Sequence, residues 1–204
     1  MIKNVREVKM SLRANYRAIR ENMNPFYKKI MDEKIMKNLC ILNKYKNADV
    51  ILVYISKEIE VDTYCIMERC WADGKKVAAP ICNTEDKSME FYIIKSLDDL
   101  SVGNFGLLEP DPTKCEKVTE FANSICIVPG FSFDKDAYRL GYGHGYYDRF
   151  LQRFNGTTIG LCYNNCICAK LPHGRFDFPV DILITNAYIK EIQKSIPTAQ
   201  DLTK

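Results

Sequence analysis

The stretch SICIVPGFSFDKDAYRLGYGHGYYDRFL, residues 124–151, decides the fold of this chain. It opens on SICIVPG, residues 124–130, an apolar run with β-branched residues that predicts a buried strand. It then passes through polar residues and three glycines at alternate positions, and continues into a segment over 146–154 that predicts a helix. A buried strand that leads through a loop into a helix is the repeating unit of α/β proteins.

The rest of the chain repeats this alternation after residue 48. We therefore predict an α/β fold of three layers, with a mostly parallel sheet, helices on both faces, and an N-terminal basic helical arm. One domain is expected over 1–204, made of the arm at 1–46 and an α/β core at 48–190. The remaining strands are predicted at 49–56, 75–80, 88–94, 156–163 and 179–185, and the remaining helices at 3–23, 26–45, 61–74 and 113–122.

The arm carries two stripes at helical spacing. The apolar stripe, expected to face inward, consists of Val5, Val8, Leu12, Tyr16, Ile19 and Met23. The cationic stripe consists of Lys3, Arg6, Lys9, Arg13, Arg17 and Arg20. Such a stripe is usually a solvated face, and we expect that for Lys3, Arg6, Arg17 and Arg20.

Composition bounds the class of protein. The chain has 204 residues, is 47% hydrophobic and carries a formal net charge of +3, which is too small to require a nucleic-acid partner. Its charged N-terminus does not resemble a secretory signal, and no apolar run is long enough to cross a membrane. The nine cysteines are an odd number without a CxxC motif, which favours reduced thiols. We expect a cytoplasmic monomer with neither nucleic-acid nor membrane partners.

The glycines at 141, 143 and 145 indicate a site for an anion. Glycine allows positive φ and brings backbone N–H groups close to a ligand, and phosphate is a common ligand of such loops. The loop matches neither the GxxxxGK[ST] phosphate loop nor the GxGxxG dinucleotide motif, because the third glycine comes one residue early and we expect no strand directly before it. The alternative is a glycine-rich turn with packed tyrosines.

Asp148 follows the glycines in the first turn of the predicted helix. It could cap that helix, which contributes about 0.5–1 kcal/mol. It could equally bind Mg²⁺ beside a phosphate, because Mg²⁺ takes one or two carboxylates together with phosphate oxygens. The residues alone leave both interpretations open.

Several colinear motifs resemble the 5-formyltetrahydrofolate cyclo-ligase family, also called methenyltetrahydrofolate synthetases. The segment FDKDAYRLGYGHGYYD is similar to the family signature, of the form F-D-x(3–4)-R-L-G-x-G-x-G-Y-Y-D. The resemblance extends, in order, through KMSLRANYRAIR, YISKEIEVDT, GKKVAAP, MEF, NFGLLEPDP and FPVDILIT. It covers nearly the whole chain.

The resemblance implies an enzyme that uses ATP and Mg²⁺ to close 5-formyltetrahydrofolate, possibly polyglutamylated, into 5,10-methenyltetrahydrofolate, with release of ADP and phosphate. The formyl oxygen would be phosphorylated, and N10 of the folate would then attack the formyl carbon. Such a reaction needs positioning and charge neutralisation more than a protein nucleophile. The resemblance leaves any general acid or base unassigned.

The resemblance also implies the roles of individual residues. Glu60 would bind the amino edge of the pterin, although alone it would be taken for a solvated loop carboxylate. His144 occupies a variable position of the signature, Phe105 stands where the family often has tryptophan, and Asp177 lies in a degenerate segment. The implied ATP ligands are Lys9, Arg13, Arg139, Gly141, Gly143, His144, Gly145, Tyr146 and Tyr147; the folate pocket is Ile55, Glu60, Phe105, Tyr146 and Tyr147; the metal ligands are Asp148 and Asp177.

Two other functions fit parts of the sequence. A sugar-phosphate isomerase or phosphosugar binder would use the glycine loop for a single phosphate, with a carboxylate base and no ATP. A nucleic-acid-binding module would use the basic arm, with Tyr142, Tyr146 and Tyr147 as stacking surfaces. The small net charge counts against the second of these.

Overall fold

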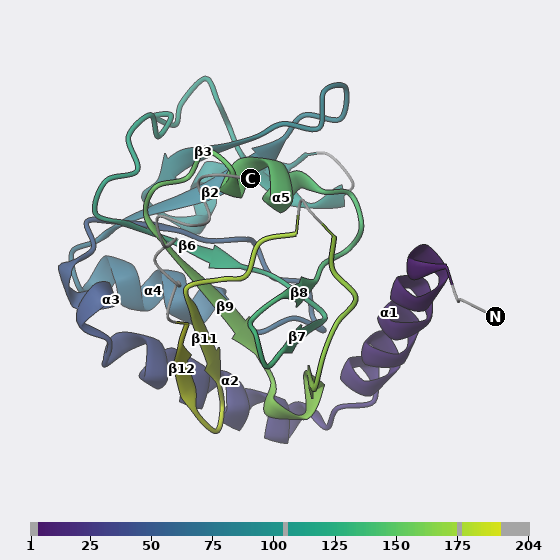
Figure 1. The fold of residues 1–204 in the computed structure, drawn as a ribbon. Coiled ribbons are helices and arrows are strands. Elements are labelled where there is room, and N and C mark those ends of the chain that lie inside the picture. Colours follow the sequence, from purple (N-terminus) through teal and green to yellow (C-terminus); the bar gives the residue numbers. More distant parts are fainter. Residues whose placement is uncertain (1–3, 104–105, 175–176, 193–204) are drawn as a thin grey trace, which may run out of the picture.

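A central twisted sheet organises the molecule (Figure 1). The structure is a computed structural model that describes residues 4–103, 106–174 and 177–192. In that part of the chain the sheet has seven strands in the order β12-β11-β9-β6-β1-β2-β3. Their bounds are β1 Val50–Leu52, β2 Lys76–Cys82, β3 Met89–Ile94, β6 Ser124–Val128, β9 Thr157–Cys162, β11 Ile182–Thr185 and β12 Ile189–Glu191.

The five inner strands run parallel, and the two edge strands β3 and β12 run antiparallel to their neighbours. Every residue of β6 is buried, as expected for a strand covered on both faces. The prediction of a mostly parallel α/β sheet is confirmed. The helices are α1 Val5–Glu21, α2 Pro25–Cys40, α3 Asn43–Asn47, α4 Tyr64–Ala72 and α5 Tyr146–Leu151.

The direction of the crossovers places the helices on both faces. The connection from β1 through α4 to β2 moves one way along the sheet, and the connection from β6 through α5 to β9 moves the other way. Since such connections are right-handed, α4 and α5 must lie on opposite faces. In Figure 1, α2, α3 and α4 gather on one side, and α5 lies on the other with a small sheet made of β7 Ser132–Asp134, β8 Arg139–Leu140 and β10 Ile167–Cys168.

The arm divides between two roles. Helix α2 packs on the sheet and buries Ile35 and Leu39 completely, whereas α1 stands at the side of the molecule next to the small sheet (Figure 1). Val5 and Ile19, both expected to face inward, are exposed. The only buried residue of α1 is Arg20.

Arg20 corrects the expectation of a solvated cationic face. It is 4% exposed, and its Nη2 donates to the carbonyl oxygen of Gly130 at 2.6 Å. Its Nη1 donates to the carbonyl of Ile59 at 3.3 Å, and the guanidinium lies over the rings of Phe131 and Tyr163. Arg6 and Arg17 are exposed as expected, and Lys3 lies outside the described residues. Helical spacing therefore found the stripe but not the member that enters the core.

The single helix predicted over 26–45 is two helices. The chain breaks at Leu42, which is extended, and α3 begins at Asn43. The break lets Leu42 and Tyr45 both enter the core while Ile41 faces solvent. In an unbroken helix Tyr45 would lie about a third of a turn away from Leu39.

The helix predicted over 113–122 is wrong. The carboxylate of Asp111 instead closes a turn on Thr113, and the chain then runs along β3. Ile93 N–H donates to the carbonyl of Glu116 at 2.8 Å, and Val118 N–H donates to that of Phe91 at 2.8 Å. Pairing with an exposed sheet edge has overridden the local helical pattern.

Some strand limits also differ from the predictions. β2 continues past Pro80 to Cys82, because beyond Ala78 its ladder with β1 has ended and the missing proline N–H costs no bond there. Several short elements carried no usable pattern in the sequence: β4 Leu100–Val102, β5 Leu108–Pro110, β7, β8, β10, β12 and the 3₁₀ turns η1 Leu97–Asp99 and η3 Asn164–Cys166. Among the helices described, none is both long and apolar enough to cross a membrane.

Replacing Arg20 with methionine should lower the free energy of unfolding by about 2–3 kcal/mol, because the carbonyls of Gly130 and Ile59, one buried and one part-buried, lose their donor. The matched control is Arg17→Met on the same helix, where the side chain is exposed and the change should stay within about 0.5 kcal/mol. Chemical denaturation of both variants measures the difference. Equal stabilities for the two would show that Arg20 does not anchor α1.

Candidate active site

The main cavity opens where the order of strands reverses. From β1 the chain moves toward β2, and from β6 it moves toward β9, so no crossover covers the carboxyl ends of β1 and β6. Ligands of open α/β sheets bind at such a point. A cavity of about 300 Å³ lies there, at the lower end of the range for small-molecule sites. Its walls come from the loop after β1, the glycine loop after β6, and β2 with β5.

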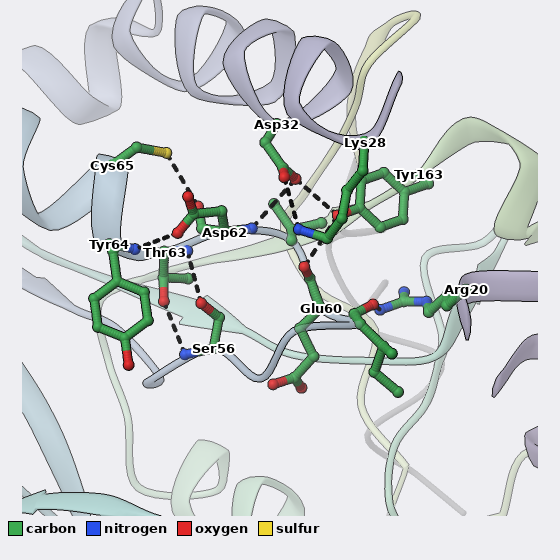
Figure 2. Close-up of polar contacts among 12 residues, drawn as sticks. Arg20, Lys28, Asp32, Ser56, Glu60, Asp62, Thr63, Tyr64, Cys65 and Tyr163 are labelled. Atoms are coloured by element: carbon green, nitrogen blue, oxygen red, sulfur yellow. Dashed lines mark hydrogen bonds and ion pairs between the residues drawn. The ribbon is translucent and has the colours of Figure 1, made fainter. Parts of the chain in front are cut away.

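The loop after β1, residues 53–63, is closed by reciprocal hydrogen bonds (Figure 2). Ser56 N–H donates to Oγ1 of Thr63 and Thr63 N–H donates to Oγ of Ser56, each at 3.1 Å. The Thr63 hydroxyl in turn donates to the carbonyl of Tyr54 at 2.6 Å. The loop is therefore rigid at its base, and it places Ile55 and Glu60 on the cavity wall.

The backbone of Glu60 is held from the side of α2. Tyr163 Oη lies 2.7 Å from Oδ1 of Asp32 and 3.0 Å from the carbonyl oxygen of Glu60. Asp32 also accepts from Lys28 Nζ at 2.8 Å and from Asp62 N–H at 3.2 Å. Figure 2 shows this network on one side of the loop and the Glu60 carboxylate directed away from it. Buried contacts thus fix the main chain and leave the carboxylate for the cavity.

Glu60 is only 5% exposed, and its carboxylate accepts hydrogen bonds from two donors. The N–H of Lys57 donates to Oε2 at 2.8 Å, and the hydroxyl of Tyr142 donates to Oε1 at 2.6 Å. Burial and the neighbouring Glu60 charge raise the pKa of Tyr142, so the phenol stays neutral and remains a donor. Glu60 is therefore an oriented acceptor rather than a solvated loop carboxylate.

The glycine loop needs glycine at two of its three positions. Gly143 has φ 98° and Gly145 has φ 74°, in the left-handed region. A Cβ on Gly143 would also meet the Arg13 guanidinium at 3.1 Å. Gly141 has neither positive φ nor a neighbour within 4 Å of such a Cβ. The loop lets α1 approach its backbone closely.

Two details of the loop differ from the sequence prediction. The short strand β8 directly precedes Gly141, because Arg139 and Leu140 pair back onto β7. Helix α5 ends at Leu151 rather than at 154, so it spans six residues. Backbone N–H groups and side-chain cations are thus better placed to bind an anion here than the dipole of so short a helix.

Cations and carboxylates together line a small hollow of about 40 Å³ next to the glycines. Lys9 Nζ pairs with Asp177 at 2.7 Å, and Arg13 Nε donates to the carbonyl of Gly141 at 2.8 Å. Arg139, whose side chain is buried, forms an ion pair with the half-buried Asp148. The hollow shares Arg139, Gly141, Gly143 and Asp148 with the main cavity, so the two spaces are adjacent.

Asp177 is ionised in this cluster. Burial alone would raise its pKa, but hydrogen bonds from Lys9 and from Gly174 N–H hold the pKa below its ordinary value. Asp148 contacts Arg139 through one oxygen and has no other partner among the described residues. Within 4–103, 106–174 and 177–192, no three His, Cys, Asp or Glu side chains cluster closely enough to hold a metal on their own.

The aromatic residues line the main cavity. The Tyr147 hydroxyl is buried and has no hydrogen-bond partner among the described residues, and burial raises its pKa. Tyr146 also faces the cavity, and exposed His144 lies 6.3 Å from its ring. Burial raises the pKa of the cavity residue Cys82 to about 11, so this thiol is neutral and a poor nucleophile. Phe105 lies outside the described residues.

The structure therefore brings most of the predicted residues together. Lys9, Arg13, Arg139, Asp148 and Asp177 surround the small hollow, whereas Ile55, Glu60, Tyr146 and Tyr147 line the main cavity with the glycines. The sequence did not indicate that Tyr142 bonds to Glu60, nor that Asp32 and Tyr163 anchor its loop. These contacts join segments far apart in the chain, and local patterns carry no signal for them.

Comparison with known proteins identifies the family. The model of the "5-formyltetrahydrofolate cyclo-ligase family" matches residues 5–186. The mitochondrial 5-formyltetrahydrofolate cyclo-ligase of Arabidopsis thaliana is 30% identical over 91% of this chain and 75% of its own length. A probable 5-formyltetrahydrofolate cyclo-ligase of Schizosaccharomyces pombe is 26% identical over 86% of this chain and 96% of its own.

A solved structure agrees with the fold over the same extent. The NMR structure of Aquifex aeolicus 5,10-methenyltetrahydrofolate synthetase superposes with a TM-score of 0.80 and 30% identity, covering 94% of this chain and 96% of that one. Matches across the arm, the glycine loop and the sheet leave no large segment unexplained. This chain belongs to the 5-formyltetrahydrofolate cyclo-ligase family and is an enzyme of that kind.

Proposed function

We propose that this enzyme converts 5-formyltetrahydrofolate into 5,10-methenyltetrahydrofolate with ATP and Mg²⁺, releasing ADP and phosphate. The observation that carries the proposal is the adjacency of two different spaces at the strand reversal. One is a small cationic hollow beside the glycines, and the other is a larger cavity with an oriented carboxylate. The first suits phosphates and the second suits a flat heterocycle with N–H donors.

The reaction needs a phosphoryl group brought to the formyl oxygen. Transfer breaks the bond between the γ-phosphorus and its bridging oxygen, and forms an O–P bond on the formyl group. N10 then attacks the activated carbon and loses its proton, and the C–O bond breaks to release phosphate. The protein's part is positioning and charge compensation. The cavity suits positioning and charge compensation, because its thiol at Cys82 is neutral, cations lie at one end, and the Glu60 acceptor lies at the other.

The ion pairs at the hollow suggest how a triphosphate would be received. Lys9 and Arg139 each hold a carboxylate, Asp177 and Asp148 respectively. Phosphate oxygens would take over the two cations and free the two carboxylates. Gly143 lines the same space, with the Arg13 guanidinium beside it. Each cation would thus exchange one anionic partner for another, so no part-buried charge would be left unpaired.

The residues fit a magnesium ion that accompanies the nucleotide. Asp148, with Asp177 nearby, would hold it, because Mg²⁺ binds one or two carboxylates and takes its other ligands from phosphates and water. When bound, the ion supplies positive charge that neutralises the transferring phosphoryl group. Two carboxylates at the hollow match this need, and a complete protein cage is not required.

At the other end of the cavity, Glu60 would bind the amino edge of the pterin. Its backbone is fixed by Tyr163, and its carboxylate is oriented by the donors at Lys57 and Tyr142. Ionised carboxylates make strong paired hydrogen bonds to planar N–H donors. The Tyr147 hydroxyl, which has no hydrogen-bond partner within the described parts of the chain, would donate to the substrate from the same wall.

An absorbance assay tests the function directly. The methenyl product absorbs in the near ultraviolet, and this absorbance should appear only when enzyme, 5-formyltetrahydrofolate, ATP and Mg²⁺ are all present. Omitting any one of them is the control for the others. Folded enzyme that gives no signal with the complete mixture would refute the proposal.

Asp148→Asn should raise the Mg²⁺ concentration that gives half the maximal rate by about 10- to 100-fold, because one carboxylate ligand is lost. The measurement is a magnesium titration of the rate at saturating ATP. Loss of the Arg139 partner alone would lower the rate at every magnesium concentration without moving the midpoint. An unmoved midpoint would therefore remove Asp148 from the metal site.

Glu60→Gln should lower kcat/KM for the folate by about 10- to 100-fold, because a charged acceptor in the cavity becomes neutral and gains N–H groups of its own. The matched control is Glu58→Gln, an exposed carboxylate two residues earlier in the same loop. KM for ATP should stay close to the wild-type value in both variants. Equal losses for both variants, or none, would contradict the role given to Glu60.

A further inference from the structure

Tyr142 joins the two halves of the cavity. It lies between Gly141 and Gly143 in the glycine loop, and its hydroxyl donates to Glu60, which lies 82 positions earlier, in the loop after β1, at 2.6 Å. The ring packs on Phe131 with centroids 4.5 Å apart, and Lys57 Nζ lies over it at 5.4 Å. One side chain thus spans from the backbone proposed to bind phosphates to the carboxylate proposed to bind the pterin.

The contact leaves Glu60 able to accept a ligand. A carboxylate has about four lone-pair directions, two on each oxygen. Tyr142 occupies one direction on Oε1 and the Lys57 N–H occupies one on Oε2. One direction on each oxygen remains, which matches two N–H groups along a pyrimidine edge. Tyr142 therefore orients the carboxylate rather than blocking it.

The backbone that carries Tyr142 is contacted by α1, and it is also the part of the loop that would bind a phosphate. The carbonyl of Gly141 accepts from Arg13 Nε at 2.8 Å, and the Arg13 guanidinium packs against Gly143. A nucleotide bound by backbone N–H groups of the glycine loop and by Arg13 would fix the backbone on both sides of Tyr142. Fixing that backbone fixes the phenol, and the phenol fixes Glu60.

We propose that Tyr142 couples nucleotide binding to folate binding through its hydrogen bond to Glu60. The inference rests on the proposed function, since it takes ATP and the folate as the two ligands. A nucleotide at the glycine loop should raise the affinity for 5-formyltetrahydrofolate, and the folate should raise the affinity for the nucleotide by the same factor. Coupling between sites typically amounts to about 5- to 150-fold, and one neutral donor to one carboxylate places the expectation near tenfold.

The test measures the dissociation constant of 5-formyltetrahydrofolate by calorimetry, with and without the β,γ-imido analogue of ATP and Mg²⁺, which cannot transfer its phosphoryl group. In the wild-type enzyme the analogue should tighten folate binding about tenfold. In Tyr142→Phe the ratio should fall to near one, while each ligand still binds alone. Titrating the analogue with and without the folate should return the same factor, as linkage requires.

Tyr163→Phe is the matched control, because it removes a hydroxyl that holds the backbone of Glu60 and leaves the Tyr142 contact in place. It should weaken folate binding by the same factor with and without the analogue, so its ratio stays at the wild-type value. A wild-type ratio of one, or a wild-type ratio retained in Tyr142→Phe, overturns the coupling. A wild-type enzyme that binds both ligands but forms no methenyl product refutes the proposed function instead.

Discussion

The structure depends on one topological constraint, the reversal of strand order between β1 and β6. Right-handed crossovers on either side of this point place α4 and α5 on opposite faces of the sheet, so no crossover in the described part of the core covers the carboxyl ends of the two strands. The loop that carries Glu60 follows one strand, and the loop that carries the glycines is reached from the other. The arm completes the site from outside: Arg20 fixes α1 against both loops, through Ile59 and Gly130, and so brings Lys9 and Arg13 to the glycines.

Charge balance explains how this crevice stays stable before ligands bind. Buried or half-buried cations need partners, and here Arg139 has Asp148, Lys9 has Asp177, and Arg20 has two backbone carbonyls. The first two partners are carboxylates that can be exchanged for phosphate oxygens. The partners of Arg20 are main-chain groups that cannot leave. On α1, Lys9 is therefore paired with a side-chain carboxylate, whereas Arg20 is held by main-chain carbonyls.

The sequence predicted what depends on local pattern. Continuous apolar runs marked the buried strands, and spaced glycines marked the loop where φ is positive at Gly143 and Gly145. It failed where a partner distant in the chain decides the outcome: segment 116–118 pairs with β3 instead of forming a helix. The prediction of a solvated Arg20 was wrong for a related reason. Periodicity defines a face of a helix, but it does not show which carbonyls and rings that face will contact. The resemblance to a family, rather than residue chemistry alone, pointed to Glu60. Only the fold shows that this residue is buried and that its carboxylate accepts two hydrogen bonds.

Glu60 shows why one side chain needs support from two directions. On the side of α2, the Tyr163 hydroxyl has one proton, which it shares between two acceptors, Oδ1 of Asp32 and the carbonyl oxygen of Glu60. On the cavity side, Lys57 N–H and Tyr142 are true donors to the carboxylate. The backbone contact belongs to the rigid core, whereas Tyr142 belongs to a loop that a ligand would engage. A buried carboxylate whose main chain is fixed by the core, and whose oxygens are oriented by a loop, can be stable without a ligand and still respond to one.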